Sequence, residues 1–211
     1  MSRARLPRSF YARAATEVAP DLLGHVLVRA LPDGTRAAVR IVEVEAYGPE
    51  DPASHAFRGM TPRNATMFGP PGHLYVYFTY GMHFCMNAVT GRAGEGSAVL
   101  LRAGEPLEGT DEMRSRRGRE PILELCSGPA RFAQALGVAR AEDGVDLVDG
   151  DRLWVERGSR SQPIGTGIRV GVSETTRAWR HWLEDDPFVS RGRPGPPSRK
   201  ARAPRVRSMT P

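Results

Sequence analysis

The chain is almost free of lysine. Among its 211 residues Lys200 is the only lysine, and the other 29 of the 30 basic residues are arginine. Covalent catalysis through a Schiff base needs a lysine or another free amine. Because Lys200 lies near the end of the sequence, only the N-terminal amine would be left for such chemistry in residues 1–190. The sequence therefore argues against a Schiff-base enzyme.

Cysteine is equally scarce. Cys85 and Cys126 are the only two, and they are too few and too far apart to indicate a disulfide framework or a zinc site. We expect each to be a small buried hydrophobic residue, as is usual in a reducing compartment.

Long hydrophobic runs are missing as well. No run of 18 apolar residues predicts a transmembrane helix, and the early arginines of residues 1–18 are not followed by the apolar segment of a secretory signal. We therefore expect a cytoplasmic protein, associated with the nucleoid if the source is bacterial, that has no membrane partner.

The sequence also lacks the common motifs for metals and phosphates. Its five histidines form no HExxH pattern, and the H-x-E with P-C-x-x-C pattern of zinc deaminases is absent. There is no GxxxxGK[ST] phosphate loop and no G-x-S-x-G elbow. We predict that the protein uses no metal and no cofactor.

Positive charge is concentrated at one end. The net charge is +6, but residues 191–211 contain six arginines, Lys200 and no acid, so residues 1–190 carry a net charge of −1. The same 21 residues contain five prolines and little apolar bulk, which is typical of disorder. We expect one domain over 1–190 and a disordered basic tail over 191–211. The tail is either a solvated end or a non-specific nucleic-acid tether.

Strand patterns dominate the predicted secondary structure. Their short spacing favours an antiparallel meander over βαβ units, with a few helices beside it. The expected strands are 25–30, 37–47, 73–80, 84–90, 96–103, 152–156 and 168–172, and the expected helices are 9–15, 18–23, 106–116 and 127–137.

Aromatic side chains gather in the segment LYVYFTYGMHFCMN at 74–87, which holds three of the five tyrosines. Strand alternation places Tyr75 and Tyr77 on one face. Tyr80 points the other way, beside the turn residue Gly81, and could project from a tip. Asn87 lies on the next strand among apolar neighbours and needs hydrogen-bond partners there. Rings with polar ends suit a flat ligand.

Carboxylates gather in a second segment, RIVEVEAY at 40–47. Glu43, Glu45 and Tyr47 share one strand face, and by itself this pattern favours glutamates that face solvent. Arg102 lies on an apolar strand and needs a carboxylate partner, for which Glu45 is one candidate. A carboxylate, an arginine, an amide and several rings together suit hydrolysis of a planar substrate.

Four runs of the sequence resemble the alkyladenine (3-methyladenine) DNA glycosylase family. The resemblance covers about residues 8–190 and implies an α+β fold, a single mixed domain with a curved antiparallel sheet and flanking helices. It implies a monomeric enzyme that flips alkylated or deaminated purines out of duplex DNA, hydrolyses the N-glycosidic bond and leaves an abasic site without cutting the strand. The substrates implied are 3-methyladenine, 7-methylguanine, ethenoadenine and hypoxanthine. The matching runs are residues 40–68, 74–87, 99–109 and 124–137.

The resemblance also assigns roles to individual residues. Glu45 is expected to activate the water, and Arg102 to hold the water and Glu45. Tyr47 and Tyr77 are expected to stack on the flipped base, and His55 to contact the edge of the base and close the pocket.

Three further residues of the same motifs face the DNA or the purine edge. Asn87 is expected to disfavour the exocyclic amine of guanine. Tyr80 is expected to intercalate where the base has left, with Met82 supporting it. This chain departs from the family at His83, where a tyrosine is common, and in the length of the loop 91–96, and both affect the expected lesion preference.

Two other functions remain open from the sequence. A DNA- or RNA-binding module without catalysis would suit the rings and the tail, but it has no need of a carboxylate near phosphates. A hydrolase of free nucleosides would need neither the tyrosine at a turn nor the basic tail. Steep weakening of binding with salt is typical of duplex binding and would separate it from binding of a small nucleoside.

Overall fold

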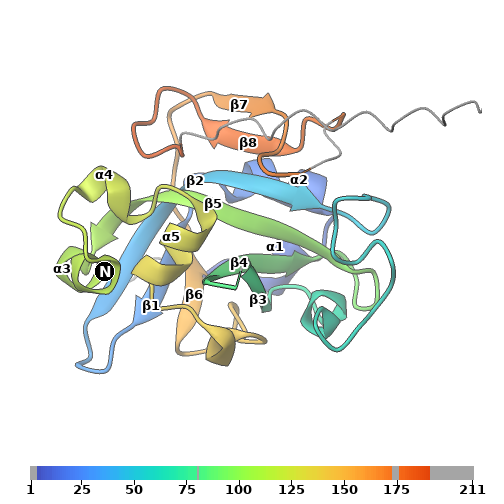
Figure 1. The fold of residues 1–211 in the computed structure, drawn as a ribbon, viewed down its shortest axis with the longest axis horizontal. Helices are drawn as coiled ribbons and strands as arrows, with labels where there is room; N and C mark the ends of the chain where they lie inside the picture. The colour runs from blue at the N-terminus through green and yellow to red at the C-terminus, as the bar shows by residue number, and fades with distance from the viewer. Residues whose placement is uncertain (1–3, 80, 173–175, 191–211) are drawn as a thin grey trace, which may run out of the picture.

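A curled antiparallel sheet, shaped as a half-barrel, forms the centre of the molecule (Figure 1). The computed structural model describes residues 4–79, 81–172 and 176–190. Within them the strand order is β3-β4-β5-β2-β1-β6, and β8 joins β2 to β7. This confirms the expected α+β class. The strands are β1 Val26–Ala30, β2 Arg36–Tyr47, β3 Leu74–Thr79, β4 His83–Thr90, β5 Ser97–Glu108, β6 Leu153–Glu156, β7 Ile164–Gly167 and β8 Arg180–Leu183.

Short helices flank this sheet. α5 packs against β4 and β5, and α2 packs against β2. Pro129 opens α5 at its first position, where the missing N–H costs nothing, and Gly137 follows its end with φ of 62°. The helices are α1 Arg8–Tyr11, α2 Ala15–Leu22, α3 Thr110–Arg117, α4 Ile122–Leu125 and α5 Pro129–Ala135, with 3-10 turns η1 at Ala65–Phe68 and η2 at Arg140–Glu142. No helix of the described residues is long and apolar enough to cross a membrane.

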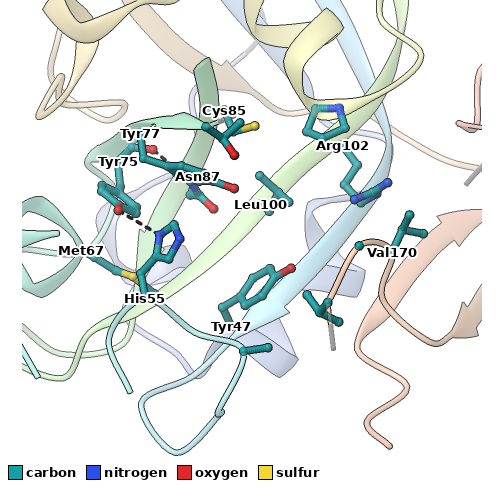
Figure 2. A pocket seen from close by; sticks show the side chains of 15 residues that line it. Tyr47, His55, Met67, Tyr75, Tyr77, Cys85, Asn87, Leu100, Arg102 and Val170 are labelled. Carbon is teal, nitrogen blue, oxygen red and sulfur yellow. Dashed lines mark hydrogen bonds between the residues drawn. The ribbon is translucent and has the colours of Figure 1, made fainter. Parts of the chain in front are cut away.

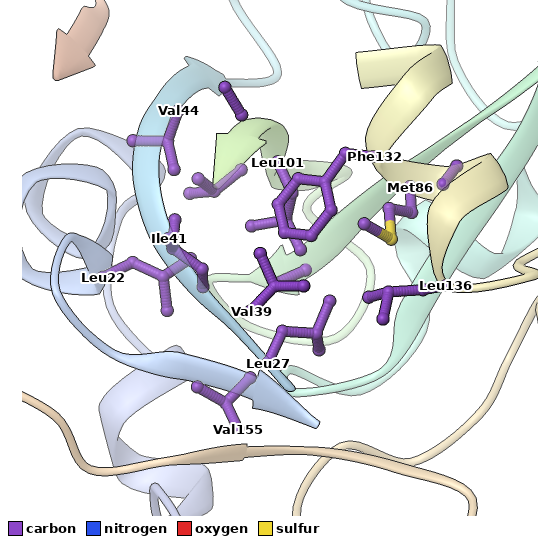
Figure 3. Packing of buried hydrophobic residues seen from close by; sticks show 14 of the residues in the cluster. Leu22, Leu27, Val39, Ile41, Val44, Met86, Leu101, Phe132, Leu136 and Val155 are labelled. Carbon is purple, nitrogen blue, oxygen red and sulfur yellow. The ribbon is translucent and has the colours of Figure 1, made fainter. Parts of the chain in front are cut away.

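The hydrophobic core lies between the sheet and its helices. Figure 3 shows Ile41 and Val44 of β2, Leu101 of β5 and Phe132 of α5 converging there. Gly104 allows a close approach of β5 to its neighbours, because a Cβ at that position would lie 2.8 Å from the Arg40 carbonyl oxygen and 3.1 Å from the Phe132 ring. Both cysteines are free and buried, as the sequence predicts.

Strand β2 determines where the chemistry-bearing residues lie. One of its edges pairs with β5 along most of its length. The other edge pairs first with β1, through Arg36–Arg40, and then with β8, where Glu43 lies opposite Trp182 and Glu45 opposite Arg180. The second half of β2 is therefore an interior strand. Register shifts on both sides of Glu43 mark irregular pairing, which re-aims side chains.

Several expected elements have different boundaries. The prediction of a strand over 168–172 is wrong, because the strand in this region, β7, lies before these residues and ends at Gly167. The helix expected from residue 106 begins at Thr110, because β5 runs through Pro106 to Glu108. The sequence patterns missed α4 and β8 altogether. Each is four residues long, too short for a periodic pattern to be recognised.

Candidate active site

A row of cross-strand partners builds the floor of a pocket. Tyr75 of β3 lies opposite Asn87 of β4, Asn87 opposite Leu100 of β5, and Leu100 opposite Glu45 of β2. Partners in such a row point to the same face of a sheet. Above this row is a cavity of about 260 Å³, close to the lower end of the range for small-molecule sites. Residues from the loop after β2 and from the segment after β7 complete its wall (Figure 2).

Three rings form one side of the pocket. The rings of Tyr75 and Tyr77 are stacked at 5.7 Å with an interplanar angle of 29°. The His55 ring meets Tyr77 edge-on at 4.5 Å, and its Nδ1 lies 3.1 Å from the Tyr75 hydroxyl (Figure 2). The structure thus brings together His55 and Tyr77, for which the family resemblance implies a place in the base pocket, and adds Tyr75 to them.

The rings keep their neutral forms near neutral pH. Although the outer part of His55 is exposed, its contact with the neighbouring rings removes water, and together with the charge of Arg63 this lowers the pKa of His55. Burial raises the pKa of Tyr75 to about 12. Burial, together with the nearby Glu45 carboxylate, raises the pKa of the Tyr47 phenol well above its usual value. The aromatic side of the pocket therefore presents neutral hydrogen-bonding groups to a ligand, and the charged lining residue is Arg102.

Glu45 is completely buried behind the pocket wall and is held by three donors. The Tyr47 hydroxyl donates to Oε2 at 2.8 Å. The Val170 backbone N–H donates to Oε1 at 2.8 Å, and Nη1 of Arg102 forms an ion pair with the same oxygen at 3.1 Å. All three partners line the pocket. A carboxylate offers about four acceptor positions, so these contacts leave one on Oε2.

The strand pattern alone favoured glutamates of β2 that face solvent, and this expectation is wrong. Glu43 and Glu45 are both 0% exposed, because the segments around Val170 and Ser190 cover their side of the sheet. Glu45 was one candidate partner for Arg102 and does pair with it. The sequence missed that Glu43 shares Arg102, whose Nε donates to Glu43 Oε1 at 2.8 Å.

Arg169 fixes the opposite wall of the pocket, and no sequence pattern pointed to it. Its guanidinium donates to both carboxylate oxygens of Asp51 in an ion pair whose side chains are 1% and 0% exposed. Its central carbon lies 4.6 Å from the centre of the Tyr47 ring. These contacts tie the segment after β7 to the end of β2, and they place the adjacent Val170 against Glu45.

Asn87 and the β3–β4 turn complete the set of expected residues. Asn87 is 5% exposed and lines the pocket, and its Nδ2 donates to the Tyr75 carbonyl oxygen at 3.1 Å. That contact supplies the hydrogen bond that the sequence required. Met82 is 70% exposed at the turn. Tyr80 lies outside the described residues, as does the segment 191–211 expected to be a tail.

The described residues contain no group of three or more His, Cys, Asp or Glu side chains that could hold a metal ion. The functional groups that remain are a buried carboxylate, an arginine, an amide and stacked rings around a small cavity. Such a combination suits a flat heterocycle held beside a carboxylate.

Comparison with known proteins defines the class of protein. The family model for methylpurine-DNA glycosylase matches residues 9–187, and the chain belongs to that family. A protein of Streptomyces avermitilis is 52% identical over 94% of this chain and 96% of its own length. A protein of Burkholderia lata is 50% identical over 92% and 93%, and one of Chlorobaculum parvum 46% identical over 93% and 95%. All three are named as candidate 3-methyladenine DNA glycosylases.

Proposed function

We propose that this protein hydrolyses the N-glycosidic bond of alkylated or deaminated purines in duplex DNA, with Glu45 as the general base. The observation that carries the proposal is the buried Glu45 carboxylate, held directly behind the wall of a base-sized aromatic cavity by three residues that line it, Tyr47, Val170 and Arg102. The names of the relatives support alkylated purines such as 3-methyladenine as substrates. Family resemblance adds 7-methylguanine, ethenoadenine and hypoxanthine.

The proposed reaction uses one carboxylate. Water bound at the remaining acceptor position of Glu45 attacks C1′ of the sugar, and Glu45 takes its proton. Arg102 holds the Glu45 carboxylate in place through their buried ion pair, whose charges are little screened by salt. Glycoside hydrolases usually need a second carboxyl group to protonate the leaving oxygen. An alkylated purine that already carries positive charge leaves without that help, so one base suffices for it. A neutral lesion such as hypoxanthine also needs a proton on its leaving nitrogen, and no residue is assigned to supply it.

The rings bind the flipped base. Tyr47 and Tyr77 stack on it, His55 contacts its edge, and Asn87 disfavours the exocyclic amine of guanine. Each stacking contact returns about 1–3 kcal/mol per base. Extrusion from the duplex costs a few kcal/mol, and less for a damaged base, so two rings are enough to hold a lesion outside the helix.

The β3–β4 turn faces the DNA in this proposal. Tyr80 intercalates where the base has left, and Met82 supports it. The exposed Phe78 and Arg63, whose guanidinium donates to the Phe78 carbonyl oxygen at 3.1 Å, line a neighbouring groove. We further propose that the protein acts as a monomer in the cytoplasm, at the nucleoid in a bacterium. Water rather than an amine is the nucleophile, so the abasic strand remains uncut.

Single-turnover base release from a purine-damaged duplex, measured in EDTA, tests the proposal. Suitable substrates are a duplex with one hypoxanthine and a duplex methylated by dimethyl sulfate, compared for the wild type and Glu45→Gln. We expect release that leaves an unnicked abasic strand, abolished in Glu45→Gln with lesion binding retained. Glu142→Gln is the matched control, because Glu142 is also buried and bound by an arginine and a backbone amide, but lies outside the pocket.

Two results would contradict the proposal. Unchanged release by Glu45→Gln would remove Glu45 from its role. Lesion binding by the wild type without any release would instead favour a DNA-binding module that lacks catalysis.

A further inference from the structure

Glu43 is a second buried carboxylate that the proposed reaction leaves without a role. It is 0% exposed, like Glu45 two residues later on β2. Its Oε1 accepts from Nε of Arg102 at 2.8 Å and from Nε of Arg180 at 2.7 Å. Its Oε2 accepts from the Ser190 backbone N–H at 2.8 Å. A carboxylate that is buried so completely and bound so fully serves either packing or the placement of its partners.

Arg102 connects the two glutamates. Its Nε binds Glu43, while its Nη1 contacts Glu45. The guanidinium group is planar and presents its donors in a rigid fork. Fixing Nε on Glu43 therefore fixes the direction in which Nη1 points. Without Glu43, Arg102 could satisfy Glu45 in several orientations, and the position of the Glu45 carboxylate would be less well defined.

Arg180 balances the charge of this group. Glu43 and Glu45 contribute two negative charges, and Arg102 and Arg180 two positive charges. Arg180 is 15% exposed at its side chain, and one of its Nη atoms also donates to the Ser190 carbonyl oxygen at 3.4 Å. Burial opposes ionisation of Glu43, but the charges of Arg102 and Arg180 and the Ser190 N–H outweigh it and lower its pKa. The four side chains are thus neutral as a set.

We propose that Glu43 and Arg180 are positioning residues for the reaction: Glu43 orients Arg102 toward Glu45, and Arg180 supplies the charge that lets Glu43 do so without drawing Arg102 away. This role deepens the proposed function and rests on it. β8 and the segment at Ser190 thereby become part of the proposed catalytic arrangement, although they do not line the pocket.

Other charged or titratable groups also face Glu45, and they set the background for any pH dependence. They come from each element that packs around it: Tyr47 of β2, Tyr77 of β3, Cys85 of β4, Arg102 of β5 and Arg169 of the segment after β7. Near neutral pH only the two arginines among them are charged, since burial raises the pKa of Tyr47, Tyr77 and Cys85.

The test compares Glu43→Gln, Arg180→Gln and the double variant with the wild type. Single-turnover release from dimethyl-sulfate-treated duplex is measured from about pH 5 to about pH 9, because the acid limb of such a profile reports the essential base. Spontaneous base loss is subtracted at each pH. Glu142→Gln again serves as the control for loss of a buried, arginine-bound carboxylate, and a urea unfolding curve shows that each variant is folded.

Opposite changes are expected from the two single variants. Glu43→Gln leaves an excess positive charge beside Glu45, so the acid limb of the profile moves to lower pH. The plateau rate falls about tenfold, which is the lower end of the loss seen when a residue that orients a metal-binding side chain is removed. Arg180→Gln leaves an excess negative charge, so its acid limb moves to higher pH. The double variant restores charge balance and returns the limb toward the wild-type position.

If Glu43 and Arg180 had a purely structural role, the acid limbs of their single variants would not move in opposite directions. A plateau rate for Glu43→Gln equal to that of Glu142→Gln, or acid limbs that move in the same direction in both single variants, would overturn the positioning role and leave the proposed function intact. Absence of release by the wild type would instead defeat the proposed function itself. If Arg180→Gln does not fold, Arg180→Lys keeps the charge and is expected to keep the wild-type acid limb; a shifted limb there counts against the role.

Discussion

The ion pair of Arg169 and Asp51 offers the sharpest test of how the pocket wall is held. Both side chains are buried, and Asp51 also accepts the Ala53 backbone N–H at 3.1 Å. Replacing Asp51 with asparagine keeps the shape but leaves the Arg169 guanidinium buried without its counter-charge. Removing one partner of a buried pair costs about 3–5 kcal/mol. Because asparagine still offers one acceptor oxygen, we expect a loss of about 3 kcal/mol in the free energy of unfolding, at the lower end of that range.

Urea unfolding at neutral pH measures this loss. For a chain of this size, about 3 kcal/mol corresponds to a fall in Tm of about 6–12 °C. The matched control is Asp111→Asn, which removes the partner of Arg114 from an ion pair whose Asp111 side chain is 96% exposed. Exposed pairs contribute about 0–1 kcal/mol, so the control should remain close to the wild type.

A second check is how the difference in unfolding free energy between the wild type and Asp51→Asn depends on pH. Burial opposes ionisation of Asp51, but hydrogen bonds from Arg169 and from the Ala53 N–H, together with the charges of Arg169 and Arg177, outweigh it and lower its pKa. A carboxyl group whose pKa is lowered on folding stabilises the protein above its unfolded pKa of about 3.9, and that contribution is lost as the pH falls further. The gap between wild type and Asp51→Asn should therefore be constant near neutral pH and shrink below about pH 4. Equal stability of Asp51→Asn and Asp111→Asn at neutral pH would refute the reasoning.

Two further predictions concern the thiols and the basic end of the chain. Cys126 is 1% exposed, and burial raises the pKa of its thiol to about 12. It should therefore react with a thiol reagent only after unfolding, and fast labelling of Cys126 in the native protein would contradict this. Removal of residues 191–211 takes away seven positive charges. The slope of the logarithm of the binding constant against the logarithm of the salt concentration should become shallower by about 0.9 for each phosphate that these residues neutralise. Single-turnover release should be unchanged. An unchanged slope would indicate that residues 191–211 do not contact the DNA.

Local patterns in the sequence determined most of the secondary structure. Alternation over residues 37–47 and 84–90 predicts strands that agree closely with β2 and β4, because period-two patterning is a local property of the chain. The same holds for α5, where Pro129 and Gly137 mark both ends. The sequence also indicated which residues could form the site, since an arginine or an amide on an apolar strand needs a polar partner.

Tertiary structure alone decided which of those residues meet. The glutamates of β2 are buried because the segments around Val170 and Ser190, which lie far along the chain, cover their face of the sheet. No alternation pattern within β2 can report such a distant covering segment. For the same reason Arg169 could not be predicted: it lies outside any regular strand, and its partner Asp51 is 118 residues away. Cross-strand register aligns Tyr75, Asn87 and Glu45 in one row, and register is set by the whole sheet rather than by any one strand.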